Sequence, residues 1–314
     1  MTVMTVGAYA VDLYMFAERL PTPGESITAT DMALAHGGKA ANAAVAAARL
    51  GATVEFVGAL GRDQEGDAAL AALRAENIDV AACQRGARRT AHSFITVDTH
   101  GRQHVTTWPG AAADLTAEHV RSRVARLTNG AVLVLQGEIP VTVSTAAALA
   151  AGRRVTVLLN PSPTGGFTGG AGAELMRRAD VLVLNADECG QLSEGPGGDI
   201  ASSAVILRQR VRARAVVVTL GERGALVVDE SGTTAVQAPP VTPVDSTGAG
   251  DCFTGVLAAA LAAGVELVAG AALACRAAAV SVTRRFCMPS YPTAADLAVA
   301  PLRPGHPAAG HGGG

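Results

Sequence analysis

Residues 243–251, which read PVDSTGAGD, combine two closely spaced glycines with a carboxylate at the start of an apolar helical stretch. Gly248 and Gly250 permit tight turns, so successive backbone N–H groups, including that of Ala249, can point toward one anion. The N-terminus of the following helix adds a partial charge of about +0.5. Asp251 would then lie beside the anion, where a general base acting on a hydroxyl group typically contributes about 10²–10⁴-fold in rate. The alternative is that Asp251 only caps the helix.

A second glycine turn, His36–Asn42, leads into another helical stretch. Its glycines let the backbone approach a ligand closely, and Lys39 and Asn42, three residues apart, share one face of the first helical turn. Both side chains could reach a polyol or a phosphate; the alternative is a capping turn with a solvated lysine. The sequence has no G-x-x-x-x-G-K-[ST] motif, and no G-x-G-x-x-G follows its first strand, which argues against a P-loop and against a dinucleotide-binding fold.

Acidic residues follow a predicted buried strand at Asn185–Glu188. Ligands of parallel sheets bind at the carboxyl ends of the strands. Asn185 and Glu188 could therefore hold Mg²⁺ through its waters, because this ion usually keeps several waters and takes few protein ligands. The alternative is that the acids simply favour the start of a helix.

Composition excludes several classes of protein. The 314 residues are 49% hydrophobic and 17% charged, with a formal net charge of -2, which argues against a disordered chain and against a nucleic-acid partner. Five scattered cysteines without a C-x-x-C motif favour a reducing, cytoplasmic compartment over a disulfide framework or a zinc site. The most apolar stretch, Cys252–Val265, is too short to span a bilayer, so we expect no membrane partner. Of 25 basic residues only Lys39 is a lysine.

Short β-branched runs alternate with Ala-rich stretches, a pattern typical of βαβ units that build a parallel sheet covered by helices on both faces. Strands are predicted at Met4–Tyr9, Thr53–Gly58, Ala131–Leu135, Val155–Leu159, Val181–Leu184, Ala215–Leu220 and Ala225–Asp229. Helices are predicted at Ala40–Leu50, Asp63–Glu76, Thr116–Leu127, Thr142–Ala150, Ile200–Arg210, Gly250–Ala263 and Leu267–Thr283.

Two segments interrupt this alternation. One is Ser26–Ala35, and the other is a hairpin formed by Ala91–Asp98 and Gln103–Trp108. They could form a small separate sheet, or they could be two more edge strands of the main sheet. The tail Pro301–Gly314, rich in Pro, Gly and His, is expected to be disordered.

Together these motifs resemble those of the ribokinase-like carbohydrate kinases, the PfkB family. Residues 37–51 with 57–67 resemble the first family signature, and residues 244–255 resemble the second. Further landmarks occur in order at Asn160–Pro163, Asn185–Glu188 and Thr219–Gly221, and residues 21–25 resemble the start of a lid. The resemblance runs from about Val3 to about Leu297.

The resemblance implies a three-layer α/β/α sandwich with a mostly parallel central sheet and a small β-sheet lid. One kinase domain would cover residues 1–300, with the lid drawn from about residues 10–35 and 90–110. The implied reaction transfers the γ-phosphate of ATP to the primary hydroxyl of ribose or of a related small sugar such as deoxyribose. Asp251 would be the base, and the N–H groups of Gly248, Ala249 and Gly250 would stabilise the transferred group.

The resemblance also implies where the ligands bind. The sugar pocket would contain Ala10, Asp12, Gly38, Lys39, Asn42, Glu138 and Asp251. ATP would lie near Asn185, Thr219, Gly221, Glu222, Gly224, Gly250 and Cys275, with Mg²⁺ held through water by Asn185 and Glu188. A K⁺ site, built largely from backbone carbonyls, would comprise Asp245, Thr247, Ser281, Arg284, Phe286 and Ser290. Lid-mediated homodimers are common in the family, so a homodimer is expected.

Ala10, Ala40 and Phe286 depart from the family pattern, and Ala40 is a mild change that replaces a glycine of the first signature. Ala10 stands where an asparagine hydrogen-bonds ribose, and a lost hydrogen bond costs about 0.5–1.5 kcal/mol. The pocket could therefore favour a sugar that lacks that hydroxyl, or a bulkier one. Phe286 replaces a glycine of the K⁺ loop, which predicts strain if the backbone there keeps a positive φ.

Two other functions compete with the sugar kinase. A nucleoside kinase of the same fold would need an aromatic shelf for the base, and the few candidates are Tyr9, Tyr14, Phe94 and Trp108. With aromatic residues at only 3%, a free sugar is favoured. A non-catalytic sugar-binding or regulatory relative is disfavoured because the residues of a working site are intact: Asp251, the glycines before it, Lys39, Asn185 and Glu188.

Overall fold

The computed structural model describes residues 2–193 and 198–302 and is built around a nine-stranded sheet. Its strand order is β15-β14-β13-β12-β11-β10-β1-β4-β6, and the strands from β13 to β6 run parallel. The two strands at the other edge, β14 and β15, are antiparallel. The bounds are β1 Thr2–Val6, β4 Thr53–Val57, β6 Ile78–Asp79, β10 Val132–Gln136, β11 Thr156–Asn160, β12 Val181–Asn185, β13 Ala215–Thr219, β14 Ala225–Asp229 and β15 Gly232–Val236.

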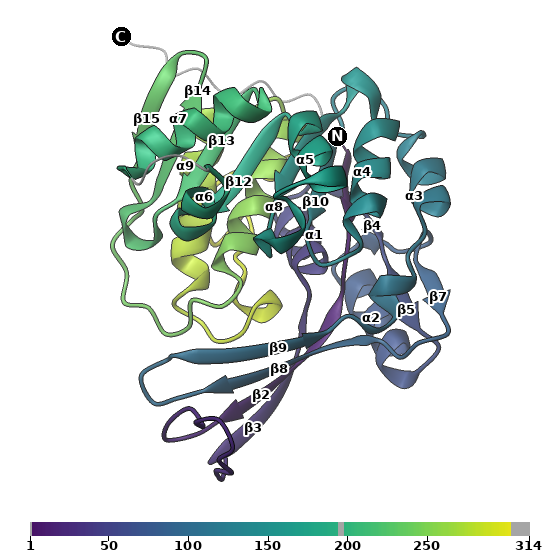
Figure 1. Cartoon of the computed structure of the whole chain (residues 1–314), viewed down its shortest axis with the longest axis vertical. Helices are drawn as coiled ribbons and strands as arrows, with labels where there is room; N and C mark the ends of the chain where they lie inside the picture. The colour runs from purple at the N-terminus through teal and green to yellow at the C-terminus, as the bar shows by residue number, and fades with distance from the viewer. Residues whose placement is uncertain (1, 194–197, 303–314) are drawn as a thin grey trace.

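Helices cover both faces of this sheet (Figure 1). Because the central strands are buried on both sides, they are continuous apolar runs, and alternate residues such as Val134 and Leu135 enter two different cores. One core contains α1 Lys39–Arg49, α2 Gln64–Ala75, α8 Ala249–Ala262 and α9 Leu267–Ser281. The other contains α3 Ala117–Val124, α4 Val141–Ala150, α5 Gly170–Arg178, α6 Ala186–Ser193 and α7 Ile200–Val211. The predicted three-layer sandwich is confirmed.

A four-stranded sheet forms the lid, which Figure 1 shows as a separate layer below the main body. Its order is β3-β2-β8-β9, and only β2 and β8 run parallel to each other. The bounds are β2 Ala10–Phe16, β3 Asp31–Gly37, β8 Ala91–Val97 and β9 Gln103–Trp108. The two segments therefore form a small sheet of their own, and the alternative of two more edge strands is wrong. A further short pair, β5 Ala59–Gly61 and β7 Gln84–Gly86, lies outside both sheets.

Strand register gives the lid two distinct faces. Asp12, Tyr14 and Phe16 alternate with Leu13 and Met15, and β9 follows the same alternation. The Nε2 of Gln103 donates to Oγ1 of Thr247 at 2.6 Å, which identifies the face that meets the main body. We call it the inner face; its residues include Asp12, Tyr14, Phe16, Ser93, Ile95 and Gln103. The outer face includes Met32, Leu34, Phe94 and Trp108.

Several boundaries differ from the sequence prediction. The first strand ends at Val6, three residues earlier than expected, because a Cβ on Gly7 would lie 2.7 Å from that of Ala40 and the chain leaves the sheet there. Strand β3 starts only at Asp31, α3 ends at Val124, and β2, α5 and α6 were not predicted.

The chain near the predicted tail is ordered further than expected. The N–H of Leu302 donates to the carbonyl of Leu50 at 2.8 Å, and Leu302 packs against the core. The rest of the predicted disordered tail, residues 303–314, lies outside the described residues. Over residues 2–193 and 198–302, no helix has the length and apolar character needed to cross a membrane.

Candidate active site

The chemistry-bearing side chains gather where β1, β10, β12 and β13 end and where α1 and α8 begin. Two helices of small residues make this possible. A Cβ on Gly255 of α8 would lie 2.2 Å from the carbonyl oxygen of Ala43 in α1, so the two helices approach closely only because glycine is present. Their first turns therefore meet, although they are about 200 residues apart in the chain.

Asp251 forms the centre of this meeting point. Nδ2 of Asn42 donates to Oδ2 of Asp251 at 2.8 Å, and Nζ of Lys39 lies 3.7 Å from Oδ1 of Asp251. Asp251 is 6% exposed. The negative charge of Asp251 raises the pKa of the Lys39 ammonium, so that this lysine stays protonated. The two predicted motifs are thus brought together around one carboxylate.

The turn before α8 has the geometry expected of an anion-binding turn. Gly248 is the N-cap with a φ of 74°, and a Cβ there would lie 2.6 Å from the Tyr291 hydroxyl and 2.7 Å from Sγ of Cys287. Only glycine fits both conditions. The amide groups of Gly250 and Asp251 belong to the first turn, where helical N–H groups have no carbonyl one turn earlier in the helix. The N–H of Ala249 differs from the others, since it donates to the carbonyl of Ser246 at 3.3 Å.

Two more carboxyl groups, those of Glu138 and Asp12, lie near Asp251. Oε2 of Glu138 accepts the backbone N–H of Lys39 at 2.7 Å, and burial raises the pKa of Glu138 to about 7. Asp12 comes from the inner face of the lid, and burial raises its pKa to about 6. A Cβ on Gly37 would lie 2.0 Å from Oδ2 of Asp12, so the first glycine of the turn leaves room for this carboxylate.

Two residues of the predicted sugar pocket play a backbone or packing role. Gly38 is the N-cap of α1 with a φ of 89°, and a Cβ there would lie 2.7 Å from the carbonyl oxygen of Ala8. Ala10 pairs with Gly37 and Ala91 in the lid sheet and is 3% exposed. Beside them, Oδ1 of Asn42 is buried and has no hydrogen-bond partner among the described residues. That oxygen is a free acceptor for a hydroxyl group.

A small cavity of about 250 Å³ opens over this centre. Its polar lining residues are Lys39, Asn160, Ser162, Asn185, Glu188, Thr219 and Asp251. Sequence reasoning did not assign Asn160 and Ser162 to the site, although it identified their segment as a family landmark. Their position at the carboxyl end of β11, with Asn160 as its last residue, is a signal that could have found them.

Asn185 and Glu188 cap a helix and also line the small cavity. Oε2 of Glu188 accepts the N–H of Asn185 at 2.9 Å, and Oδ1 of Asn185 accepts the N–H of Glu188 at 2.8 Å. This reciprocal cap starts α6. Both residues also line the small cavity, so an amide and a carboxylate lie within reach of the waters of a hydrated Mg²⁺ ion.

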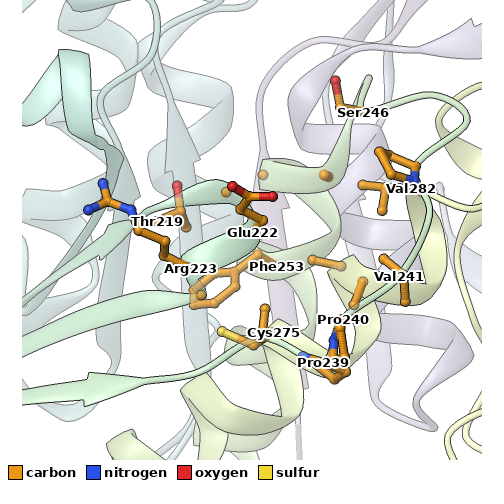
Figure 2. A pocket seen from close by; sticks show the side chains of 18 residues that line it. Thr219, Glu222, Arg223, Pro239, Pro240, Val241, Ser246, Phe253, Cys275 and Val282 are labelled. Carbon is orange, nitrogen blue, oxygen red and sulfur yellow. The ribbon is translucent and has the colours of Figure 1, made fainter.

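A larger cavity of about 690 Å³ adjoins the small one, and the two share Thr219 and Gly250. Of the residues predicted to bind ATP, it is lined by Thr219, Gly221, Glu222, Gly224, Gly250 and Cys275. Figure 2 shows Thr219 and Arg223 on one side, Pro240, Val241 and Val282 on the opposite side, and Phe253 and Cys275 between them. Burial raises the pKa of the Cys275 thiol to about 11, which keeps it neutral.

Apart from Arg223 and Ser246, the lining that sequence reasoning missed is apolar. Phe253 follows Asp251 by two residues, and Pro239–Val241 forms the opposite wall. The proline-rich run 239–243 was the available signal for a rigid wall. The cavity therefore offers flat apolar surface to a planar ring and few polar side chains.

The residues predicted to hold K⁺ come from two adjacent segments. Oδ1 of Asp245 accepts the N–H of Thr247 at 2.9 Å, and Oδ2 accepts the N–H of Phe286 at 2.8 Å. Phe286 has a φ of 67°, a left-handed conformation that is strained for a bulky residue. The second segment is closed internally by bonds from Ser281 to Ala278, from Ser290 to Cys287 and from Arg284 to Ser290. Among the described residues, no group of three or more His, Cys, Asp or Glu side chains is arranged to hold a metal.

Comparisons with known proteins agree with this arrangement. A family model described as pfkB family carbohydrate kinase matches residues 2–294. The chain is 30% identical over 296 residues to the ribokinase of Haemophilus influenzae, which covers 93% of this chain and 95% of that protein. The crystal structure of ribokinase from Thermotoga maritima matches with a TM-score of 0.86 at 28% identity, covering 95% of this chain and 98% of that one. The Arabidopsis thaliana ribokinase, solved with ribose and ATP, matches with a TM-score of 0.80 at 27% identity, covering 95% and 97%.

Proposed function

Because the chain belongs to the pfkB family of carbohydrate kinases, and is thus a phosphotransferase with an alcohol acceptor, we propose that it phosphorylates the primary hydroxyl of ribose or a related small sugar with ATP. The observation that carries this proposal is the convergence of Asn42 and Lys39 on Asp251 at the N-terminus of α8. The small polar cavity beside Asp251, lined by Asn185 and Glu188, suits the phosphates of ATP with Mg²⁺, and the larger apolar cavity beyond Gly250 suits the rest of the nucleotide.

In the proposed mechanism Asp251 accepts the proton of the sugar hydroxyl. The hydroxyl oxygen forms a bond to the γ-phosphorus while the bond from that phosphorus to the bridging oxygen breaks, releasing ADP. Asn42 holds one carboxylate oxygen of Asp251 in place. The Lys39 ammonium and the first-turn amides of α8 stabilise the charge on the transferred group, since phosphoryl transfer is chiefly positioning and electrostatics.

Asn185 and Glu188 would hold Mg²⁺ through its waters, because their oxygens line the small cavity. The ion would neutralise charge on the phosphates of ATP. The K⁺ site is a further proposal. Phe286 keeps a backbone conformation that a glycine would adopt, so the carbonyl groups of its loop can follow the path that the family resemblance implies. Rates that are equal in KCl and in NaCl at one ionic strength would contradict a K⁺ requirement.

A free sugar is favoured over a nucleoside by the position of the aromatic residues. Phe94 and Trp108 belong to the outer face of the lid, away from Asp12. Tyr9 hydrogen-bonds His36 at the base of the lid, and Tyr14 packs against Phe286 with 1% of its surface exposed. None of the four offers a free shelf for a nucleobase.

We also propose a homodimer formed through the lid, in the cytoplasm. The outer face exposes 61% of Met32, 64% of Leu34 and 43% of Trp108, more apolar surface than isolated exposed residues would present. All five cysteines are unpaired, which suits a reducing compartment. A mass close to 31.5 kDa by light scattering at working concentration would contradict the dimer.

The test of the proposed function is an ATP-consumption screen over pentoses, deoxypentoses, ketohexoses and nucleosides, with identification of the product by mass. Including deoxyribose tests Ala10, which has no side chain to hydrogen-bond a sugar hydroxyl. Asp251→Asn keeps the shape but removes the base, and we expect it to lower kcat by at least about 10²-fold. If no acceptor is phosphorylated, or if Asp251→Asn retains full activity, the proposal is wrong; a nucleoside as the preferred acceptor would replace the sugar.

A further inference from the structure

A cluster of aromatic and cationic side chains joins the inner face of the lid to the loop at residues 285–286. The rings of Tyr14 and Phe286 lie edge to face with centroids 5.2 Å apart, and Tyr14 stacks on Phe16 at 6.2 Å. The Arg285 guanidinium lies over the Phe16 ring, 5.8 Å from its centroid. We call Tyr14, Phe16, Arg285 and Phe286 the lid latch. Edge-to-face and cation–π contacts of this kind are attractive beyond the area that they bury.

The lid latch continues directly into the anion-binding turn. The N–H of Phe286 donates to Oδ2 of Asp245, two residues before Thr247. Its neighbour Cys287 places Sγ against Gly248, where a Cβ would lie only 2.7 Å away. The hydroxyl of Tyr291 donates to the carbonyl of Gly248 at 3.0 Å. A shift of Phe286 would therefore be transmitted to the residue that caps α8.

A second contact joins the edge strand β9 of the lid to the same turn. Nε2 of Gln103 in β9 donates to Oγ1 of Thr247 at 2.6 Å. The lid thus contacts Thr247, the residue before Gly248, through Gln103, and it contacts the loop of Phe286, which packs on Gly248, through Tyr14. Both contacts come from the same face of the lid that supplies Asp12.

The backbone at Phe286 favours a different residue. Its φ of 67° is a conformation that glycine adopts freely and a bulky side chain rarely does. Strain at such positions persists only where surrounding contacts maintain it. Here those contacts are the ring of Tyr14 and the hydrogen bond to Asp245.

We propose that Phe286 is a positioning residue that couples closure of the lid to the geometry of the anion-binding turn. This inference rests on the proposed kinase function and deepens it. With the lid held down, the acceptor hydroxyl rather than water faces the γ-phosphorus. With the lid latch loosened, water can attack: its oxygen bonds to the γ-phosphorus, the bond to the bridging oxygen breaks, Asp251 takes the proton, and ADP and inorganic phosphate leave.

The decisive variant is Phe286→Gly, which removes the ring and relieves the backbone strain together, so it is expected to fold. Loss of an aromatic pair corresponds to roughly a 2- to 10-fold change in the population of the closed lid. We therefore expect the KM for the sugar to rise and the ratio of ATP hydrolysed to sugar phosphorylated to increase, each by roughly 2- to 10-fold. The KM for ATP should not change, because Phe286 lines neither cavity described above. Phe286→Tyr, which keeps a ring at this position, should retain the wild-type coupling.

The matched control is Arg212→Gly. Arg212 also has a left-handed backbone, with a φ of 57°, at the end of α7 and outside the lid latch. This variant relieves the same kind of strain. The KM for the sugar and the ratio of ATP hydrolysed to sugar phosphorylated should both stay at their wild-type values.

An independent measurement separates this proposal from the proposed function. Hydrogen exchange of the β2 and β3 amides should be faster in Phe286→Gly than in the wild type, and unchanged in Arg212→Gly, whether or not an acceptor is known. Wild-type exchange and wild-type kinetics in Phe286→Gly would overturn the lid latch. An enzyme that phosphorylates no sugar, yet shows the difference in exchange, would overturn the proposed sugar kinase function and leave the coupling standing.

Discussion

Two regions beside Asp251 are built in opposite ways: the acceptor side around Lys39 and Asn42, and the nucleotide side in the larger cavity. On the acceptor side, Lys39, Asn42 and Asp251 are partly or fully buried and tied to one another, and Glu138 bonds the backbone of Lys39. On the nucleotide side, the walls are mostly proline, valine, alanine and Phe253, with Glu222 and Arg223 as the charged lining residues.

The difference indicates how each side would work. Removing one member of a buried charged network is costly, because the remaining charged groups stay buried without a hydrogen-bond or ion-pair partner. Apolar walls act by shape, and the loss of one small side chain leaves most of the contact area in place. We therefore expect single substitutions to have large effects on the acceptor side and small ones on the nucleotide side.

The largest effect is expected from Gly248→Ala. The added methyl group would meet the Tyr291 hydroxyl at 2.6 Å and Sγ of Cys287 at 2.7 Å, at a positive φ. The first-turn amides should move off the transferred phosphoryl group, lowering kcat by about 10²–10³-fold. Gly264→Ala is the matched control, since Gly264 has a φ of 76° with nothing within 4 Å of its Cβ. Steady-state kinetics that show the same kcat for both variants would remove the turn from the mechanism.

Lys39→Arg should have the next largest effect. Arginine keeps the charge, but its planar guanidinium cannot replace a compact ammonium 3.7 Å from Asp251 without displacing it. We expect kcat to fall roughly 10-fold, since small errors in position are costly in catalysis. A variant with wild-type turnover would mean that the only lysine in the chain is retained there without a catalytic reason.

The pH dependence of the acceptor side offers a third test. Burial raises the pKa of Asp12, which is predicted to belong to the sugar pocket, to about 6, so its carboxyl group is protonated below that pH. The kcat/KM for the sugar should therefore fall as the pH drops through about 6. In Asp12→Asn the kcat/KM for the sugar should be lower than in the wild type, and it should no longer fall as the pH drops through about 6. An unchanged profile in the variant would assign the limb to another group.

Cys275→Ala should have the smallest effect. Its thiol is neutral and forms one small part of an apolar wall. The KM for ATP should change by less than about 3-fold, which corresponds to the loss of a fraction of one buried side chain. A much larger change would show that the nucleotide side depends on a specific polar contact and would break the comparison.

Local patterns predicted much of this architecture. The strand at Ala225–Asp229 has the predicted bounds, and the lid hairpin differs by one residue. Each is marked by β-branched runs or turn residues within a short window. Both glycine turns could also be predicted, because glycine permits tight turns and close approach of the backbone whatever the surrounding fold.

Features that depend on distant partners could not be predicted from local patterns. Strand β2 pairs with β8 some 80 residues later, and its own sequence has no turn signal that defines it. The bond from Asn42 to Asp251 exists only because Gly255 lets α1 and α8 touch. Register alone turns Phe94 and Trp108 outward, which no composition could reveal. The left-handed backbone of Phe286 was inferred only from the family resemblance.

The most direct test of the account is the structure of the enzyme with ribose and a non-hydrolysable ATP analogue. We predict that the primary hydroxyl oxygen of the sugar lies about 2.6–3.2 Å from a carboxylate oxygen of Asp251. The adenine should lie in the larger cavity against Phe253 and Cys275, with the γ-phosphate at the first turn of α8. A sugar whose primary hydroxyl faces away from Asp251, or a nucleotide bound outside the larger cavity, would contradict it.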